Sequence, residues 1–125
     1  PLGCSSSELE VAMGDAEFAL ENTKNELLAF TRVKALFSGI CYLDLHVLES
    51  KNISTSFRSL LVSLAKDHEA DKFYVQLLPE EAAEIACLQE LGFEEEVRLR
   101  EHLFIDGQFH DLLMFGLTSR QLRTA

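Results

Sequence analysis

Three features that assign chains to broad classes are missing from this sequence. No apolar run approaches the roughly 20 residues that a membrane-spanning helix needs, so we expect no membrane partner. The three cysteines, Cys4, Cys41 and Cys87, are widely spaced and form no CxxC pair, which argues against a metal or disulfide framework. Residues 1–7 lack the basic start and apolar stretch of a signal peptide, and a cytoplasmic location is expected.

Basic charge is also scarce. The 125 residues include 11 Lys and Arg against 21 Asp and Glu, which gives a net charge of −10. An acidic surface repels phosphate backbones, so we expect no nucleic-acid partner. Such a surface favours a cationic substrate or a basic partner, although solubility alone also explains it. The length suits one domain, and 47% hydrophobic residues suffice for a packed core.

Short alternating segments in the first part of the chain predict a three-stranded antiparallel meander. The strands are expected at residues 17–21, 26–37 and 40–48, with a polar turn at residues 22–25. Residues 26–37 also fit a helix, because their large apolar side chains fall near one helical face. We favour the strand, because turns flank it on both sides. Cys41 and Cys87 stand in apolar surroundings and are expected to be reduced core residues.

Helical and strand patterns alternate in the rest of the chain. Ser54, Thr55 and Ser56 are candidate N-caps for a helix, and Gly92 is the expected C-cap of a second helix that Pro79 opens. Asp106-Gly107 predicts a hairpin turn. The expected elements are a helix from residue 57 to residue 65, a strand at residues 73–78, a helix at residues 79–91, strands at residues 95–105 and 108–117, and a tail at residues 122–125.

The resulting order is β-β-β-α-β-α-β-β. It predicts an α/β (α+β) domain over residues 17–121, with a mixed, mostly antiparallel sheet flanked by helices. The first helix should connect two parallel strands as a crossover. Residues 1–16 are interpreted as a tail or the remnant of a first helix region.

This order resembles the GNAT superfamily of acyl-CoA N-acyltransferases over about residues 17–117. The resemblance is carried by a helix ending in Leu91-Gly92-Phe93, the Asp106-Gly107 turn and a last strand containing His110-Asp111. It implies transfer of an acetyl group from acetyl-CoA to a small-molecule or peptide amine. The first strand and helix of a full member are not apparent. This implies a trimmed member or a sheet completed by another chain, such as a homodimer formed through the edge strand at residues 17–21.

The resemblance also implies where acetyl-CoA binds. In the family, a Gln/Arg-x-x-Gly-x-Gly/Ala loop at a helix N-terminus binds the pyrophosphate. Asn52 takes the place of the Arg or Gln here, and Thr55 and Phe57 replace the two glycines. Either the small hydroxyl residues still admit the phosphate, or Phe57 fills its site. The implied cofactor-binding residues are Val47, Leu48, Asn52, Ile53, Ser54, Thr55, Ser56, Phe57 and Arg58.

Candidate catalytic residues lie on the strand at residues 40–48. Asp44 and His46 share one face, and an imidazole titrates in the range needed to deprotonate an ammonium substrate. They are also explained as the polar face of a strand. The family's tyrosine general acid corresponds to Leu88, and its asparagine at the start of that helix falls near Glu81.

Two alternatives accompany this hypothesis. Ser56-Phe57, Leu60-Leu61, Ala70-Asp71 and the Leu-Gly-Phe motif also resemble ornithine decarboxylase antizyme, which implies a non-catalytic binding or regulatory protein without acyl-CoA. A metal site is the second alternative, and its candidate ligands lie in the final hairpin: His102, Asp106, His110 and Asp111. We favour turn and surface roles for them and expect no metal.

Overall fold

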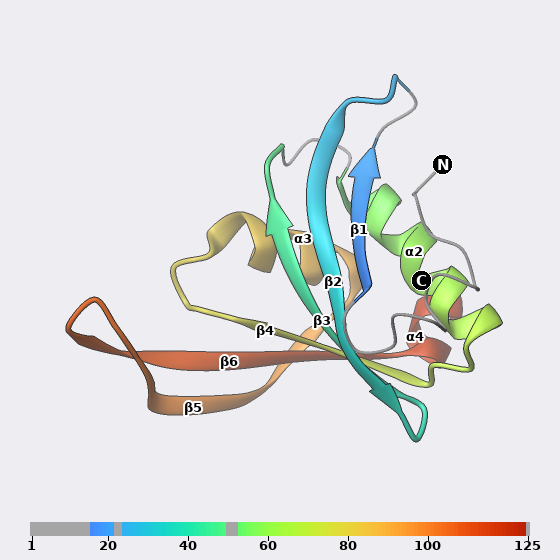
Figure 1. Cartoon of the computed structure of the whole chain (residues 1–125). Coiled ribbons are helices and arrows are strands. Elements are labelled where there is room, and N and C mark those ends of the chain that lie inside the picture. The colour runs from blue at the N-terminus through green and yellow to red at the C-terminus, as the bar shows by residue number, and fades with distance from the viewer. Residues whose placement is uncertain (1–15, 22–23, 50–52, 125) are drawn as a thin grey trace.

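A computed structural model describes residues 16–21, 24–49 and 53–124 of the chain (Figure 1). Its described elements are the strands β1 (Ala16–Glu21), β2 (Leu27–Phe37), β3 (Ile40–Val47), β4 (Lys72–Leu77), β5 (Glu94–Ile105) and β6 (Gln108–Thr118), and the helices α2 (Ile53–Asp67), α3 (Ala82–Leu91) and α4 (Ser119–Thr124). Of these helices, none combines the length and apolar character that crossing a bilayer requires.

The six strands form one mixed sheet in the order β1-β2-β3-β4-β6-β5. Only β3 and β4 pair in parallel, and α2 connects them as the expected crossover. The other neighbouring pairs are antiparallel. The predicted fold class is therefore confirmed, including the strand interpretation of residues 26–37. Strand β1 forms one edge of this sheet, and self-association through it stays a prediction.

Two tight turns need backbone conformations that ordinary side chains avoid. Ser38 and Gly39 have φ angles of 54° and 77°, and Asp106 and Gly107 have φ angles of 51° and 79°. Consecutive positive φ angles are typical of the type I′ turn, whose twist matches that of its strands. At Gly39 the positive φ favours glycine, and an added Cβ atom would lie 2.6 Å from Oδ2 of Asp71, whose side chain would have to shift.

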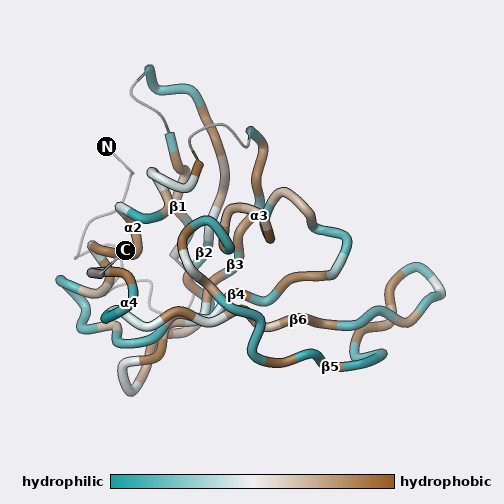
Figure 2. Tube along the Cα trace, turned by 180° about the vertical axis from the view of Figure 1, so that it is seen from behind, coloured by the Kyte–Doolittle hydropathy of each residue, from teal (hydrophilic) through white to brown (hydrophobic). Residues whose placement is uncertain are grey.

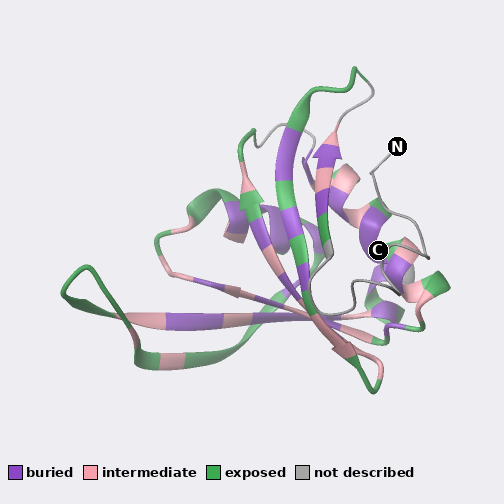
Figure 3. Cartoon of the chain, viewed as in Figure 1, coloured by how far each residue is buried: buried purple, intermediate pink, exposed green. Residues whose placement is uncertain are grey.

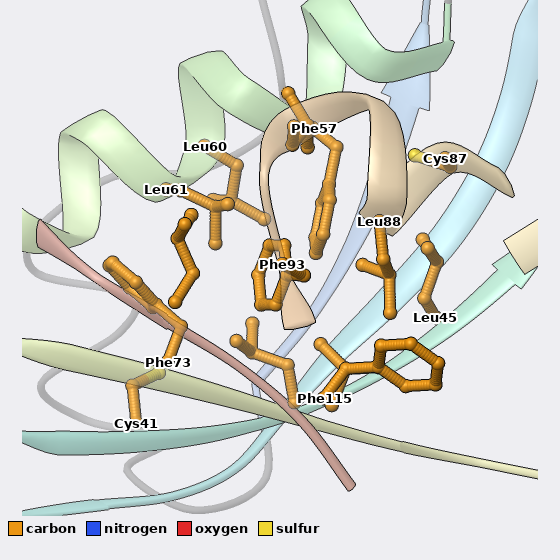
Figure 4. Close-up of a cluster of buried hydrophobic side chains, with 14 of the residues drawn as sticks. Cys41, Leu45, Phe57, Leu60, Leu61, Phe73, Cys87, Leu88, Phe93 and Phe115 are labelled. Carbon is orange, nitrogen blue, oxygen red and sulfur yellow. The ribbon is translucent and has the colours of Figure 1, made fainter. Parts of the chain in front are cut away.

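Helices cover one face of the sheet. Buried residues alternate with partly exposed ones along β3 and β4, as Figure 3 shows. The buried side chains meet α2 and α3, where Phe57 stacks on Phe93 with ring centroids 6.4 Å apart (Figure 4). Cys41 and Cys87 are free and buried in this core. Burial raises their thiol pKa values to about 12 and about 11, so neither is a thiolate at neutral pH.

Two predicted helix starts are wrong, and one short helix was not predicted. α2 begins at Ile53, so Ser54, Thr55 and Ser56 form its first turn rather than its N-cap. Ile53 is 2% exposed, so the first residue of this helix already packs in the core. α3 begins at Ala82 rather than at Pro79, and Glu81 is its N-cap. Gly92 is the C-cap, as predicted, with a φ of 100°.

The third correction concerns the chain after β6, where α4 replaces part of the predicted tail. Thr118 and Gln121 form a reciprocal cap. The Gln121 side chain accepts from the Thr118 N–H at 2.9 Å, and the Gln121 N–H donates to the Thr118 hydroxyl at 3.1 Å. Leu122 is 1% exposed, and its carbonyl accepts a hydrogen bond from Arg58 at 2.5 Å. This short helix is therefore part of the core.

The hairpin of β5 and β6 reaches away from the helices as an arm, and hydrophilic residues follow much of β5 (Figure 2). A break in the β5–β6 register lies between Leu99 and Leu103. Asp111 holds this irregular segment, since its carboxylate accepts from the Arg98 guanidinium and from the Glu101 N–H, each at 2.9 Å. These contacts lower the pKa of Asp111, with the Glu101 N–H as the largest cause and Arg98 next.

The burial of Leu122 predicts a large loss of stability in Leu122→Ala. Removing a fully buried leucine side chain costs about 2–4 kcal/mol, because apolar contacts are lost and a cavity is left. Chemical denaturation measures this change. Arg120→Ala is the matched control, because Arg120 is exposed on the same helix and should change stability by less than about 0.5 kcal/mol. Equal stability of Leu122→Ala and the wild type would contradict a core role for α4.

The lowered pKa of Asp111 predicts an acid-dependent contribution to stability. A carboxyl whose folded pKa is depressed stabilises the fold above its unfolded pKa, near 3.8, and loses this contribution as the pH falls through its folded value. Asp111→Asn should therefore be less stable than the wild type at pH 6, with a smaller difference near pH 3. Thermal unfolding of both proteins across this range measures it, and a constant difference would refute the assignment.

Candidate functional site

The sheet opens between its two central strands. Parallel pairing of β3 with β4 stops at Leu43 and Val75. β3 continues to Val47 along β2, whereas β4 continues to Leu77 along β6. Figure 1 shows the two strands diverging, with α3 beside the opening. Backbone groups of β3 beyond Leu43 therefore lack β4 as a hydrogen-bonding neighbour.

Side chains of α3 line this opening. The Val47 N–H donates to the Glu84 carboxylate at 2.8 Å, and Glu84 is only 7% exposed. Leu88 follows one turn later and is fully buried. In Figure 4 its side chain points toward Leu45 and Phe115, which come from β3 and β6. The opening is therefore lined by the Glu84 carboxylate, which accepts from the Val47 N–H, and by the apolar side chain of Leu88.

The N-terminus of α2 lies beside an open pocket. Ser54, Thr55, Arg58, Glu90 and Leu91 line this pocket, which has a volume of about 260 Å³. The first N–H groups of a helix have no intrahelical partner and carry partial positive charge. The first turn of α2 contains no acidic residue. The pocket therefore combines helix N–H donors with the Arg58 guanidinium, which also donates to the Leu122 carbonyl, and it includes the acidic side chain of Glu90.

Phe57 does not face this pocket. Its side chain is fully buried and stacks on Phe93 in the core. Phe57 therefore does not fill this pocket. Ser56 also turns away, because its hydroxyl donates to the Glu21 carbonyl at 3.1 Å.

The structure brings together only part of the cofactor-binding set expected from the sequence. Ser54, Thr55 and Arg58 line the pocket, and Val47 lies at the opening of the sheet. Ile53 is buried in the core, and Leu48 is 51% exposed. Asn52 lies outside the described residues.

Asp44 and His46 lie on the face of β3 opposite the buried side chains. Asp44 is paired with Arg32 at 2.7 Å and approaches Lys34 at 3.6 Å, so two cations neutralise its carboxylate. The His46 side chain is exposed. Burial raises the pKa of Glu81, and the Leu78 N–H partly opposes this effect. Of the two candidates, His46 has the more accessible side chain for proton transfer.

Glu84 is the site residue that the sequence analysis missed. The position of Glu84 in the sequence predicts only a favourable negative charge near a helix N-terminus. A signal was present, because Glu84 shares one helical face with Leu88 and Leu91 at spacings of four and three residues. A carboxylate on the buried face of an amphipathic helix needs a specific partner. The sequence did not show that this partner is the backbone of β3.

Two of the four candidate metal ligands of the final hairpin, His110 and Asp111, have other partners. Asp111 binds Arg98 and the Glu101 N–H, and Nδ1 of His110 lies 3.3 Å from Glu80. Within the described ranges, no group of three or more His, Cys, Asp or Glu residues is arranged to hold a metal ion.

The sequence matches no protein-family model and no curated protein, so the comparisons rest on solved structures. A variant of spermidine N-acetyltransferase SpeG from Vibrio cholerae superposes with a TM-score of 0.78 at 16% identity, over 95% of this chain and 75% of that chain. A ribosomal-protein alanine acetyltransferase from Vibrio fischeri gives a TM-score of 0.73 at 13% identity, over 90% and 66%. The structure of RimL, a ribosomal alpha-N-protein acetyltransferase in complex with coenzyme A, gives 0.68 at 18% identity, over 76% and 57%. These likenesses, together with the sheet opening described above, show that the chain has the fold of the GNAT acetyltransferases.

Proposed function

We propose that this chain is an acyl-CoA-dependent N-acyltransferase domain that moves an acetyl group from acetyl-CoA to an amine. The observation that carries the proposal is the divergence of β3 and β4 beside the N-terminus of α2. An acyl-CoA molecule contains both amides and phosphates. Its amides can pair with the edge of β3 that β4 leaves, and its phosphates can bind at the N-terminus of α2.

In the proposed complex, the phosphates of acetyl-CoA lie against the first turn of α2. The N–H groups of Ser54 and Thr55 and the Arg58 guanidinium are the donors there. The pantetheine arm follows the edge of β3 toward Val47, where its amides replace the pairing that β4 no longer provides. The thioester then lies in the opening of the sheet, and the amine approaches from the open face of β3.

The chemistry requires one proton acceptor and one leaving group. The amine attacks the thioester carbonyl after losing a proton to His46, directly or through water, and Asp44 stays paired with its two cations. The tetrahedral intermediate loses its second nitrogen proton to water, and its collapse then forms the amide and releases the thiolate of coenzyme A. Leu88 has no proton to give, so the thiolate is protonated by water.

The acceptor is proposed to be a cationic amine. The net charge of −10 attracts such a molecule over distances comparable to the Debye length. The similar structures are named for spermidine and ribosomal-protein acetylation, and both of these acceptors present amines.

A second function is favoured by two specific observations. The Val47 N–H is occupied by Glu84, and the position of the family's tyrosine acid holds the buried Leu88. Both fit a binding or regulatory module that retains the fold without acyl-CoA chemistry. Binding of acetyl-CoA decides between the two functions.

The proposed function predicts saturable binding of acetyl-CoA that depends on the first turn of α2. Thr55→Glu should weaken it by about tenfold or more, because the new carboxylate repels the phosphates in the pocket. The fold should be retained, since an acidic residue in the first turn of a helix is favourable. Isothermal titration calorimetry measures the affinities.

Ser59→Glu is the matched control, because it adds the same charge one turn further along α2 and outside the pocket. Its affinity should stay within about threefold of the wild type. Absence of acetyl-CoA binding at millimolar concentration would overturn the proposal and favour the non-catalytic module.

A further inference from the structure

We propose that the hydrogen bond from Val47 to Glu84 is a latch that closes the sheet opening, and that the pantetheine arm of an acyl-CoA must displace it. The inference rests on the proposed function and adds a form of regulation to the same site. Glu84 is then a gating residue that lowers the apparent affinity for the cofactor.

The Val47 N–H has no hydrogen-bonding partner on β4. A buried N–H group without a partner is costly, and the divergence of β3 from β4 removes the neighbouring strand at this point. The Glu84 carboxylate meets this demand at 2.8 Å across 37 residues of sequence. Hydrogen bonds to an ionised acceptor are stronger than those between neutral groups, so the contact holds α3 against the end of β3.

Glu84 and a pantetheine amide compete for one donor, the Val47 N–H. Each offers an oxygen acceptor to the same Val47 N–H, and that N–H can make one good hydrogen bond. A ligand that runs along β3 therefore exchanges with Glu84 instead of adding a contact. The observed affinity is reduced by the cost of breaking the latch.

A Glu84 carboxylate that is released from Val47 stays near the N-terminus of α3. Glu81 is the N-cap of α3 and makes no side-chain cap, so Glu84 is the third residue of the first turn. A carboxylate at this position is stabilised by the partial positive charge of the helix N-terminus. In the proposed latch the Glu84 side chain therefore has two favourable positions, one on the Val47 N–H and one near the α3 N-terminus.

Calorimetry with coenzyme A tests the latch in four proteins. Glu84→Ala should bind about tenfold or more tightly than the wild type, because a hydrogen bond to a charged group no longer has to be broken. Glu84→Gln retains an oxygen acceptor for Val47 but loses its charge, so its affinity should lie between those of the wild type and Glu84→Ala. Glu95→Ala removes an exposed carboxylate on β5 and should also leave the affinity unchanged.

The outcomes separate the latch from the proposed function. If the wild type binds and Glu84→Ala binds no more tightly, the latch is overturned and the acyl-CoA site stands. An equal gain in Glu84→Gln or Glu95→Ala would assign the effect to charge and would also overturn it. Absence of binding in all four proteins would overturn the proposed function together with the latch.

Nuclear magnetic resonance of the Val47 amide gives a second measurement of the latch. Glu84→Ala should shift this amide proton upfield, because its charged acceptor is lost, and coenzyme A should move the wild-type signal. An unchanged Val47 signal in a folded Glu84→Ala protein would refute the contact on which the latch depends.

Discussion

The loss of pairing between β3 and β4 beyond Leu43 and Val75 is the constraint on which the rest of the site depends. Each strand keeps its outer neighbour, so neither can turn back to restore the central ladder. Backbone donors that lose a strand must find another partner, because an unpaired buried N–H is costly. Here Glu84 of α3 is the partner of the Val47 N–H. In the proposed latch this contact closes the opening, and its displacement by a ligand makes the opening accessible.

Packing and chemistry make different demands on the same few positions. Phe57 and Leu88 stand where the family pattern has a small residue and a tyrosine, and both are fully buried. Phe57 strengthens the core by stacking on Phe93, and it leaves the pocket at the α2 N-terminus open. Leu88 fills the floor of the opening and gives up a proton donor. The chain has the fold without the tyrosine that the resemblance implies at residue 88, and fold alone does not specify the reaction.

Local patterns in the sequence predicted most of the architecture. Period-two alternation located the strands, and the glycines at residues 39, 92 and 107 located turns and a cap where positive φ angles are needed. α4 was missed because six residues carry little periodicity, although Thr118 and Gln121 have capping-box spacing. Glu84 was missed for a different reason. Its partner lies on a distant strand, and sequence patterns report which face a side chain occupies rather than what it meets there.

The central claim is that the end of β3 binds the pantetheine arm of an acyl-CoA. Amide hydrogen exchange of residues 44–47, with and without saturating acetyl-CoA, tests it most directly. The account predicts slower exchange in this segment on binding, because ligand amides replace the absent strand, with little change along the distant arm of β5 and β6. Unchanged exchange at residues 44–47 under saturating ligand would contradict the account.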